Sequence, residues 1–413
     1  MMLRSVGLSP DRGKNNVMTR PRTFPIVLAG FTAFLDLYAT QPLLPLLTRV
    51  FGATHVAVSL TVTASTLAVA IGAPFVGRLA DLVGRKRVIV WSAVGLAVTT
   101  GLAATSTSLA QLVAWRFAQG LFTPGVFATA IAYIHEEWPA THVSRATSAY
   151  VSGTVIGGFC GRAVAGLVAS AAGWPAAFVT LAVLNLAAAS AVAMWLPRER
   201  ATATGLGGGG HRRSILALLQ NGQLVATNVV GFCVLFTQVA VFTYVTFHLG
   251  GAPYGLSTAA LGWLFVVYLI GAAVTPIAGR WVDSQGHRAG LGLGMSIAIV
   301  GAVGTLAPWM PAIVAGLALV ATGVFISQAT ASSYIGAVTV SDRGLAVGLY
   351  SLWYYAGGSL GAALPGLFWD AGGWPASVAL VVAVQVATIA IALRFWTVTG
   401  RGGEGLLREL VSP

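Results

Sequence analysis

The feature of this sequence that most limits its possible folds is a series of apolar stretches, each about 20 residues long, separated by short polar loops. A stretch of that length can cross the hydrocarbon core of a membrane as one helix. Inside lipid every backbone N–H and C=O must be paired within the protein, so only helices and closed barrels can span it. The stretches lack the period-two alternation of barrel strands, which leaves helices. Twelve spans are predicted, at residues 24–47, 55–77, 88–105, 109–134, 146–171, 175–197, 221–248, 258–279, 289–307, 311–338, 346–371 and 375–396.

Composition and charge agree with a chain that is embedded in a lipid bilayer. Charged residues make up 8% of the 413 and apolar residues 56%, whereas a soluble domain carries about 25% charged residues. The net charge is +12, but the basic residues are scattered between the apolar stretches and form no single face, so no nucleic-acid partner is expected. The two cysteines, Cys160 and Cys233, lie within apolar stretches. Neither a disulfide framework nor a metal site nor a cofactor is predicted.

The loops between the spans predict how the chain is oriented and divided. Basic residues gather in alternate loops, and the other set of loops holds only Arg49. Since basic loops face the cytoplasm, we expect both termini to be cytoplasmic. The composition, rich in Ala, Gly and Arg and poor in Lys, suggests a bacterial genome and hence the inner membrane. The predicted parts are a cytoplasmic tail at 1–23, a six-helix bundle at 24–197, a Gly-rich cytoplasmic linker at 198–220, a second six-helix bundle at 221–396 and a cytoplasmic tail at 397–413.

The two halves of the chain repeat each other. A run of small residues that ends in Gly-Trp-Pro at 173–175 recurs about 200 residues later as a run that ends in Gly-Trp-Pro at 373–375. Repeats in the same orientation are typical of transporters whose binding site lies between the halves, near the middle of the membrane. The predicted fold class is therefore all-α, with twelve transmembrane helices in two pseudo-symmetric bundles.

The loop after the second span carries a specific motif. It contains Gly77, Asp81, Gly84 and Arg85, followed by two further basic residues. The glycines permit a close approach and a sharp turn between helices. Asp81 can accept hydrogen bonds at the N-terminus of a neighbouring helix, where an anion is favoured. This loop resembles the signature loop of the major facilitator superfamily, and a degenerate second copy with Asp283 lies in the second half.

The resemblance implies that this cluster latches the cytoplasmic side of the protein in one conformational state. Arg85 is expected to reach Glu136 or Glu137 at the cytoplasmic end of span four. The alternative is that the basic residues only mark the cytoplasmic side, but this leaves Asp81 and its glycines unexplained. The predicted latch residues are Gly77, Asp81, Gly84, Arg85, Glu136, Glu137 and Asp283.

Two charged residues within the spans are candidates for proton coupling. Arg116, in the run Trp-Arg-Phe-Ala-Gln-Gly, resembles the buried arginine of the superfamily's span-four motif. Asp36 is the only carboxylate that lies deep in a predicted span. Because a charged group in the membrane interior is costly, an isolated carboxylate there takes up a proton readily. Two alternatives stay open: a permanent ion pair between Asp36 and Arg116, and an arginine that reaches toward the membrane surface.

Polar and aromatic side chains in the spans predict a substrate cavity. Tyr38 and Gln41 follow Asp36 in a run, Asp-Leu-Tyr-x-x-Gln-Pro-Leu-Leu-Pro, that resembles the efflux-permease branch of the superfamily. In span five the chain has Arg162 after a glycine, where antiporters of the superfamily carry a Gly-Pro step. Asp36, Arg116 and Arg162 are expected at similar depth in one cavity, and its surplus positive charge suggests an anionic group on the substrate. The predicted cavity residues are Tyr38, Gln41, Arg162, Gln238, Gln328 and Tyr354.

These features predict a secondary transporter and not an enzyme. The sequence has no phosphate-binding loop for ATP and no soluble segment large enough for a catalytic domain. The resemblance implies proton-coupled export of a small molecule, such as a drug, a sugar or a metabolite, by a chain that acts as a monomer. Proton-coupled uptake of a metabolite or organic anion is the alternative, since the sequence fixes neither direction nor substrate. A membrane receptor or scaffold would need large partner-binding domains, which this sequence does not contain.

Overall fold

The computed structural model describes residues 23–197, 199, 218–339 and 343–396, with the backbone alone at Asp283 and Arg343. Most of the predicted linker and nearly all of both predicted tails lie outside these residues. Within them all regular structure is helical. The first half contains α1 (Phe24–Leu35), the short 3-10 helix η1 (Gln41–Leu43), α2 (Leu44–Phe51), α3 (His55–Val83), α4 (Arg85–Ala103), α5 (Leu109–Glu137) and α6 (Ala140–Trp195). The second half contains α8 (Gly222–Gly250), α9 (Thr258–Leu264), α10 (Val267–Gln285), α11 (His287–Gly304), α12 (Met310–Val338), α13 (Arg343–Ala363) and α14 (Pro365–Phe395).

Helix lengths show how often the chain crosses a membrane. Nine stretches of the described helices are long and apolar enough to cross one. One of them is α6, with 56 residues, and a straight helix of that length would extend about 84 Å, more than twice a hydrocarbon core of about 30 Å. It crosses twice, because Gly173 interrupts the helix with a φ of 85°. α14 turns in the same way at Gly373, and its first turns continue α13. With α1 and α2 counted as one crossing, and α9 and α10 as another, the described helices form the twelve predicted transmembrane helices.

The first crossing is not the unbroken span that the sequence predicted over 24–47. α1 ends at Leu35, and the chain passes through turns from Asp36 to Thr40 before η1 and α2 begin. Pro42 has no N–H to donate to the carbonyl four residues earlier, and it disfavours helical geometry in the residue before it. The backbone carbonyls at this break need hydrogen-bond donors from elsewhere in the protein.

Glycines of the repeated run bring neighbouring helices into backbone contact. A Cβ atom at Gly157 of α6 would meet the carbonyl of Phe31, and one at Gly161 would meet the carbonyl of Leu35 in α1. The same arrangement recurs where Gly361 of α13 packs on the backbone of α8. Glycines of this run therefore let neighbouring helices pack closely, and the repeat of the sequence is also a repeat of the packing.

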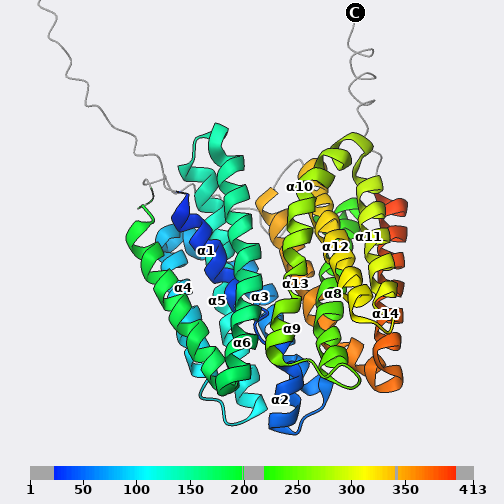
Figure 1. The fold of residues 1–413 in the computed structure, drawn as a ribbon. Coiled ribbons are helices and arrows are strands. Elements are labelled where there is room, and N and C mark those ends of the chain that lie inside the picture. The colour runs from blue at the N-terminus through cyan, green and yellow to red at the C-terminus, as the bar shows by residue number, and fades with distance from the viewer. Residues whose placement is uncertain (1–22, 198, 200–217, 340–342, 397–413) are drawn as a thin grey trace, which may run out of the picture.

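The two halves are joined on one side of the molecule. Figure 1 shows them as two groups of helices, with α1 beginning and α14 ending at the same end of the molecule. Toward the opposite end, α9 of the second half lies against α6, and the Thr258 hydroxyl donates to the carbonyl of Gly166 at 3.0 Å. Thr63 of α3 and Ser359 of α13 exchange reciprocal hydrogen bonds of 3.2 and 3.1 Å. These contacts lie on the side away from the basic loops.

Candidate proton and substrate site

Asp36 begins the break in the first crossing, and the first bundle encloses its carboxylate. The residue is 1% exposed. Its Oδ2 accepts a hydrogen bond from the Thr100 hydroxyl of α4 at 2.7 Å. It accepts another from the Asn185 amide, in the part of α6 that follows Gly173. Gln119 of α5 donates to the same Thr100 hydroxyl at 2.5 Å. Asp36 Oδ1 and the Asn185 side-chain oxygen are buried without a hydrogen-bond partner, so this network has more acceptors than donors.

Arg116 of α5 donates hydrogen bonds to the backbone at the break and not to the carboxylate of Asp36. It is completely buried, which excludes the predicted alternative of an arginine that reaches the membrane surface. Its guanidinium donates to the backbone carbonyls of Asp36 at 2.9 Å and Leu37 at 2.5 Å, and through Nε to Thr61 at 3.1 Å. In the described part of the chain, Arg116 and Asp36 form no side-chain ion pair within 4.0 Å. Arg116 therefore supplies the donors that the break requires, since a buried carbonyl without one costs about 1–3 kcal/mol.

Arg162, in the part of α6 that precedes Gly173, lies where the first bundle meets the second. It is 3% exposed. Its Nε donates to the side-chain oxygen of Gln41 at 2.8 Å, and Nη1 donates to the carbonyl of Gly158 at 2.6 Å. Two of the three rings that surround its guanidinium come from the second half of the chain. The ring centres lie 4.6 to 4.9 Å from the guanidinium carbon and belong to Tyr38, Phe265 and Tyr268.

The other predicted cavity residues contribute polar groups of the second half. Gln238 lies near the hydroxyl of Tyr268, one of the rings around Arg162. Gln328 accepts a hydrogen bond from Tyr350 at 3.1 Å, and Tyr354 stacks on Tyr350 with ring centres 5.8 Å apart. All three predicted residues are half-buried. Gln41 links the halves, because its amide donates to the Thr243 hydroxyl of α8 at 3.1 Å.

The sequence predicted three charged residues in one cavity, but the structure places them in two separate sites. Asp36 and Arg116 belong to a network inside the first bundle, whereas Arg162 contacts aromatic rings at the boundary between the halves. Residue number predicts how deep a side chain lies along a span, but not its direction around the helix axis. Because the helix ends at Leu35, helical spacing does not relate the directions of the side chains that follow. The Asp36 carboxylate points into the first bundle, whereas Tyr38 and Gln41 reach the boundary between the halves.

Sequence reasoning missed several residues of these sites, among them Thr100, Asn185, Phe265 and Tyr268. Asn185, the amide that donates to Asp36, stands in the apolar run Leu-Asn-Leu, and a lone amide in a span is a usable sign of a buried polar contact. Phe265 gives no comparable signal, because an aromatic residue in a span most often packs against its neighbours. Its contact with Arg162 follows only from the packing of α9 against α6.

The signature loop joins α3 to α4 and carries the predicted acidic contact. Arg85 contacts Glu136 of α5 and lies 3.4 Å from Asp81. The Asp81 side chain is 67% exposed, so it is open to solvent in this conformation. Gly84 turns the chain with a φ of 100°, and a Cβ atom there would meet the carboxylate of Glu199. Glu199 in turn accepts a hydrogen bond at 2.9 Å from a backbone N–H in the first turn of α4, where an anion is favoured.

The remaining predicted latch residues are Gly77, Glu137 and Asp283. Gly77 has open space around its Cβ position, so the close helix approach that it permits is not made in this conformation. Glu137 is the half-buried last residue of α5. The side chain of Asp283 lies outside the described part of the structure. The conformational role of these residues stays a prediction.

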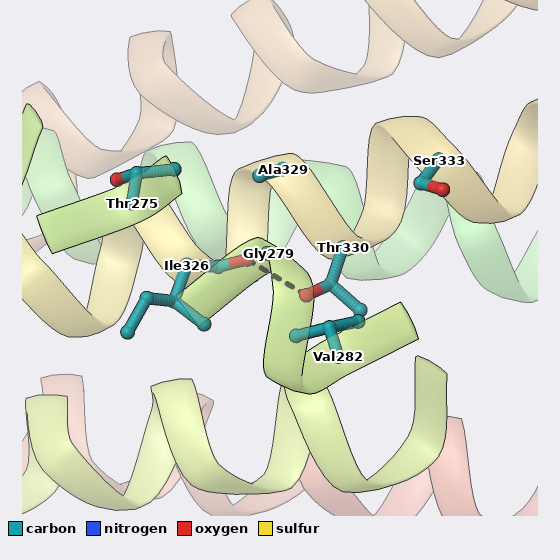
Figure 2. Close-up of a pocket in the computed structure, with 7 residues that line it drawn as sticks. All are labelled: Thr275, Gly279, Val282, Ile326, Ala329, Thr330 and Ser333. Carbon is teal, nitrogen blue, oxygen red and sulfur yellow. Dashed lines mark hydrogen bonds between the residues drawn. The ribbon is translucent and has the colours of Figure 1, made fainter. Parts of the chain in front are cut away.

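A small cavity in the second bundle is separate from both sites. It has a volume of about 50 Å³ and lies between α10 and α12 (Figure 2). Its hydroxyl groups already have partners, since Thr275 donates to Gly271 and Thr330 donates to Ile326, both at 2.8 Å. The Ser333 hydroxyl lies 3.2 Å from Nε2 of His287 in α11. None of the predicted substrate residues lines it. This cavity is a packing feature of the second bundle.

Two repeated bundles, a signature loop with its acid–arginine contact and a buried polar network at a broken helix together define a multi-pass membrane transporter. The sequence model of the Major Facilitator Superfamily matches residues 26–253 and 251–409. The chain belongs to that superfamily. It is a transport protein and not an enzyme.

Known proteins resemble the chain over most of its length. The uncharacterized MFS-type transporter YybF of Bacillus subtilis strain 168 is 32% identical over 369 residues, which cover 89% of this chain and 91% of YybF. The inner membrane transport protein YnfM of Escherichia coli K12 is 30% identical over 375 residues, with 90% and 89% covered. Among solved structures, a bacterial homologue of the human lysosomal transporter Spinster, inward-facing and unoccupied, matches with a TM-score of 0.69 and 16% identity over 90% of this chain and 94% of that chain. This last likeness shows the same fold.

Proposed function

We propose that this transporter exports a small molecule in exchange for protons and that Asp36 carries the proton. One observation supports the proposal above all others. Asp36 is a buried carboxylate with one oxygen unpartnered, in a network whose acceptors outnumber its donors. A proton on Oδ1 adds a donor where the network lacks one, and it removes a negative charge from an interior of low dielectric constant.

The backbone of the first crossing connects this proton site to the boundary between the halves. The carbonyl of Asp36 accepts a hydrogen bond from Arg116, and a few residues later Tyr38 and Gln41 contact Arg162. A change of charge on the Asp36 carboxylate alters the electrostatic environment of Arg116 and of the break that Arg116 holds. Protonation is thereby linked to the side chains at the boundary, and such a link supplies the coupling free energy that exchange requires.

The proposed mechanism is alternating access, with the bundles at 24–197 and 221–396 rocking against each other. We take the basic side as cytoplasmic, with both termini there and the protein in a bacterial inner membrane. The contacts that join α3 to α13 and α6 to α9 then close the external side in this conformation. In the alternate state Asp81, now exposed, reaches a helix N-terminus of the second half and closes the cytoplasmic side. Both halves belong to one chain, so a monomer is a complete transporter.

Uptake of an organic anion together with protons is the second candidate function. The buried guanidinium of Arg162, which has neutral neighbours at the boundary, favours it because such a group attracts an anion. Export is our first choice because the run that begins with Asp36 resembles the efflux permeases.

A flux measurement in proteoliposomes tests the proposed function. Vesicles are loaded with each member of a panel of cationic, neutral and anionic compounds, and efflux is followed after the bath is made acidic. We expect faster efflux of the transported compound under this gradient than at equal pH, and a protonophore should abolish the difference. Protein-free vesicles control for leakage of weak acids and bases. Accumulation from an acidic bath would instead support uptake, and a transported compound that does not respond to the gradient would contradict proton coupling.

A further inference from the structure

The neighbours of the Arg162 guanidinium are neutral. They are the amide oxygen of Gln41, the carbonyl of Gly158 and three aromatic rings. Among the described residues, no carboxylate lies within 4.0 Å of its nitrogens. The deep carboxylate of Asp36 is bonded inside the first bundle. Since a buried charge is normally paired, Arg162 lacks a counter-charge in this part of the structure.

The side chains around Arg162 add hydrogen-bond donors and apolar surface but no opposite charge. Tyr38, Tyr268 and Tyr354 lie near one another, and each hydroxyl can donate a hydrogen bond. Gln238 lies near the Tyr268 hydroxyl and, like Tyr354, is half-buried. These groups come from both halves of the chain. A positive charge with hydroxyl donors and aromatic faces is complementary to an anionic group on an apolar or aromatic body.

We propose that Arg162 recognises the substrate and that the substrate carries an anionic group, a carboxylate or a comparable oxyanion, on an apolar or aromatic body. This inference rests on the proposed transport function, but not on its direction or on the role of Asp36. Arginine suits the task because its planar guanidinium can donate to two oxygens in parallel. Gln41, which now accepts from Arg162, also donates to Thr243 of α8. An anion that takes over this donor therefore alters a contact between the halves, as transport requires.

The competing interpretation is that Arg162 only seals the external side through cation–π contacts with Phe265 and Tyr268. A seal without recognition predicts that replacing Arg162 changes the stability of the protein and the transport of every substrate alike. Recognition predicts a dependence on the charge of the ligand. A measurement of ligand binding therefore separates the two interpretations.

The test is ligand-dependent thermal unfolding of the purified full-length protein in detergent. The probes are benzoate, phenylacetate and hexanoate, and benzamide, phenylacetamide and hexanamide are their neutral counterparts. We expect at least one anion to raise the Tm in proportion to its binding, and its amide to have no effect. In Arg162→Gln the apparent affinity for that anion should fall about tenfold or more, as for a lost charged hydrogen bond. Arg145→Gln, an exposed position on the same helix, is the matched control and should bind as the wild type does.

Two further variants keep the test decisive. Arg162→Lys keeps the positive charge but loses the planar pair of donors, so it should fold and bind the anion more weakly than the wild type. Asp36→Asn leaves the contacts of Arg162 in place and should still bind the anion in preference to its amide, so a failure of proton coupling and a failure of anion recognition can be told apart. If no anion stabilises the wild type more than its amide does, or if Arg162→Gln and Arg162→Lys bind as tightly as the wild type, Arg162 does not recognise an anionic substrate.

Discussion

Arg116 is a charged residue whose contacts are mostly with backbone. It donates to carbonyls of two crossings, at Asp36, Leu37 and Thr61. A lysine offers one compact ammonium group and cannot reach all three. We expect Arg116→Lys to lower the Tm in detergent and Arg116→Met to lower it further, since each buried carbonyl left unpaired costs about 1–3 kcal/mol. An unchanged Tm in both variants would mean that other contacts support the break.

The residues of the two sites differ in how far the sequence could predict them. Asp36, Arg116 and Arg162 stand out because charge is rare within apolar spans. Their partners do not stand out, because they come from distant parts of the chain: Asn185 lies 149 residues after Asp36. Which charged residues share a site depends on how the helices are rotated, and the sequence does not contain that information in readable form. For this reason Arg162 was predicted beside Asp36 but lies at the boundary instead.

At the scale of the helices, the contact between α1 and α6 depends on small residues. A Cβ atom at Gly161 would meet the Leu35 carbonyl directly before the break, whereas a Cβ atom at Gly348 of α13 would meet open space. We expect Gly161→Ala to lower both the Tm and the transport rate, because α1 must move away from α6. Gly348→Ala, the control, should leave both unchanged or raise the Tm slightly, since alanine favours a helix by about 1 kcal/mol over glycine. Equal effects of the two substitutions would contradict this account of the packing.

The proposed latch role of Asp81, in the signature loop, can be tested without disturbing the fold. Asp81 is 67% exposed and contacts only Arg85, at 3.4 Å, among the ion pairs of the described residues. We expect Asp81→Asn to leave the Tm close to that of the wild type and to lower the transport rate, because the substitution removes a charge that the alternate conformation uses. Transport and thermal unfolding are measured on the same preparation. A normal transport rate in the well-folded variant would remove the argument for a latch.

The helices themselves were largely predictable, and their irregularities were not. Apolar length alone located the twelve crossings, because lipid forces the backbone into helices. The break at Asp36 escaped prediction because the run around it is as apolar as a continuous helix, although Pro42 is a sign of it. The sharp turn within α6 coincides with Gly173, where a positive φ favours glycine.

Across the whole molecule, the two halves share the same helix packing but differ in where buried charged residues lie. Gly157 and Gly357 pack on the backbone of Phe31 and Phe232, respectively, so Thr237 takes the place in α8 that Asp36 takes in the first half. Among the described residues, the second half therefore has a neutral hydroxyl where the first half has its deep carboxylate. We infer that proton coupling, if it occurs at Asp36, is a property of the first half alone.

The proposed closure of the external side can be tested by cross-linking. Thr63 and Ser359 lie in contact between the halves, because each hydroxyl donates to the backbone carbonyl of the other residue, at 3.2 and 3.1 Å. Cysteines at these two positions are therefore candidates for a disulfide. In a background with Cys160 and Cys233 replaced, we expect the Thr63→Cys, Ser359→Cys double variant to lose transport on oxidation and to regain it with a reductant. Each single variant is a control and should remain active in oxidant. Full activity of the cross-linked protein would contradict alternating access through this side.

The most direct measurement compares substrate flux in wild type and Asp36→Asn, each with and without a pH gradient, in proteoliposomes of equal protein content. Asparagine preserves the shape of the side chain but cannot carry a proton on and off. We predict that the variant loses the flux driven by the gradient and keeps counterflow at equal pH, because the boundary residues and their substrate contacts are intact. Equal gradient-driven flux in the two proteins would show that Asp36 is only a structural partner of Thr100 and Asn185 and that the proton binds elsewhere.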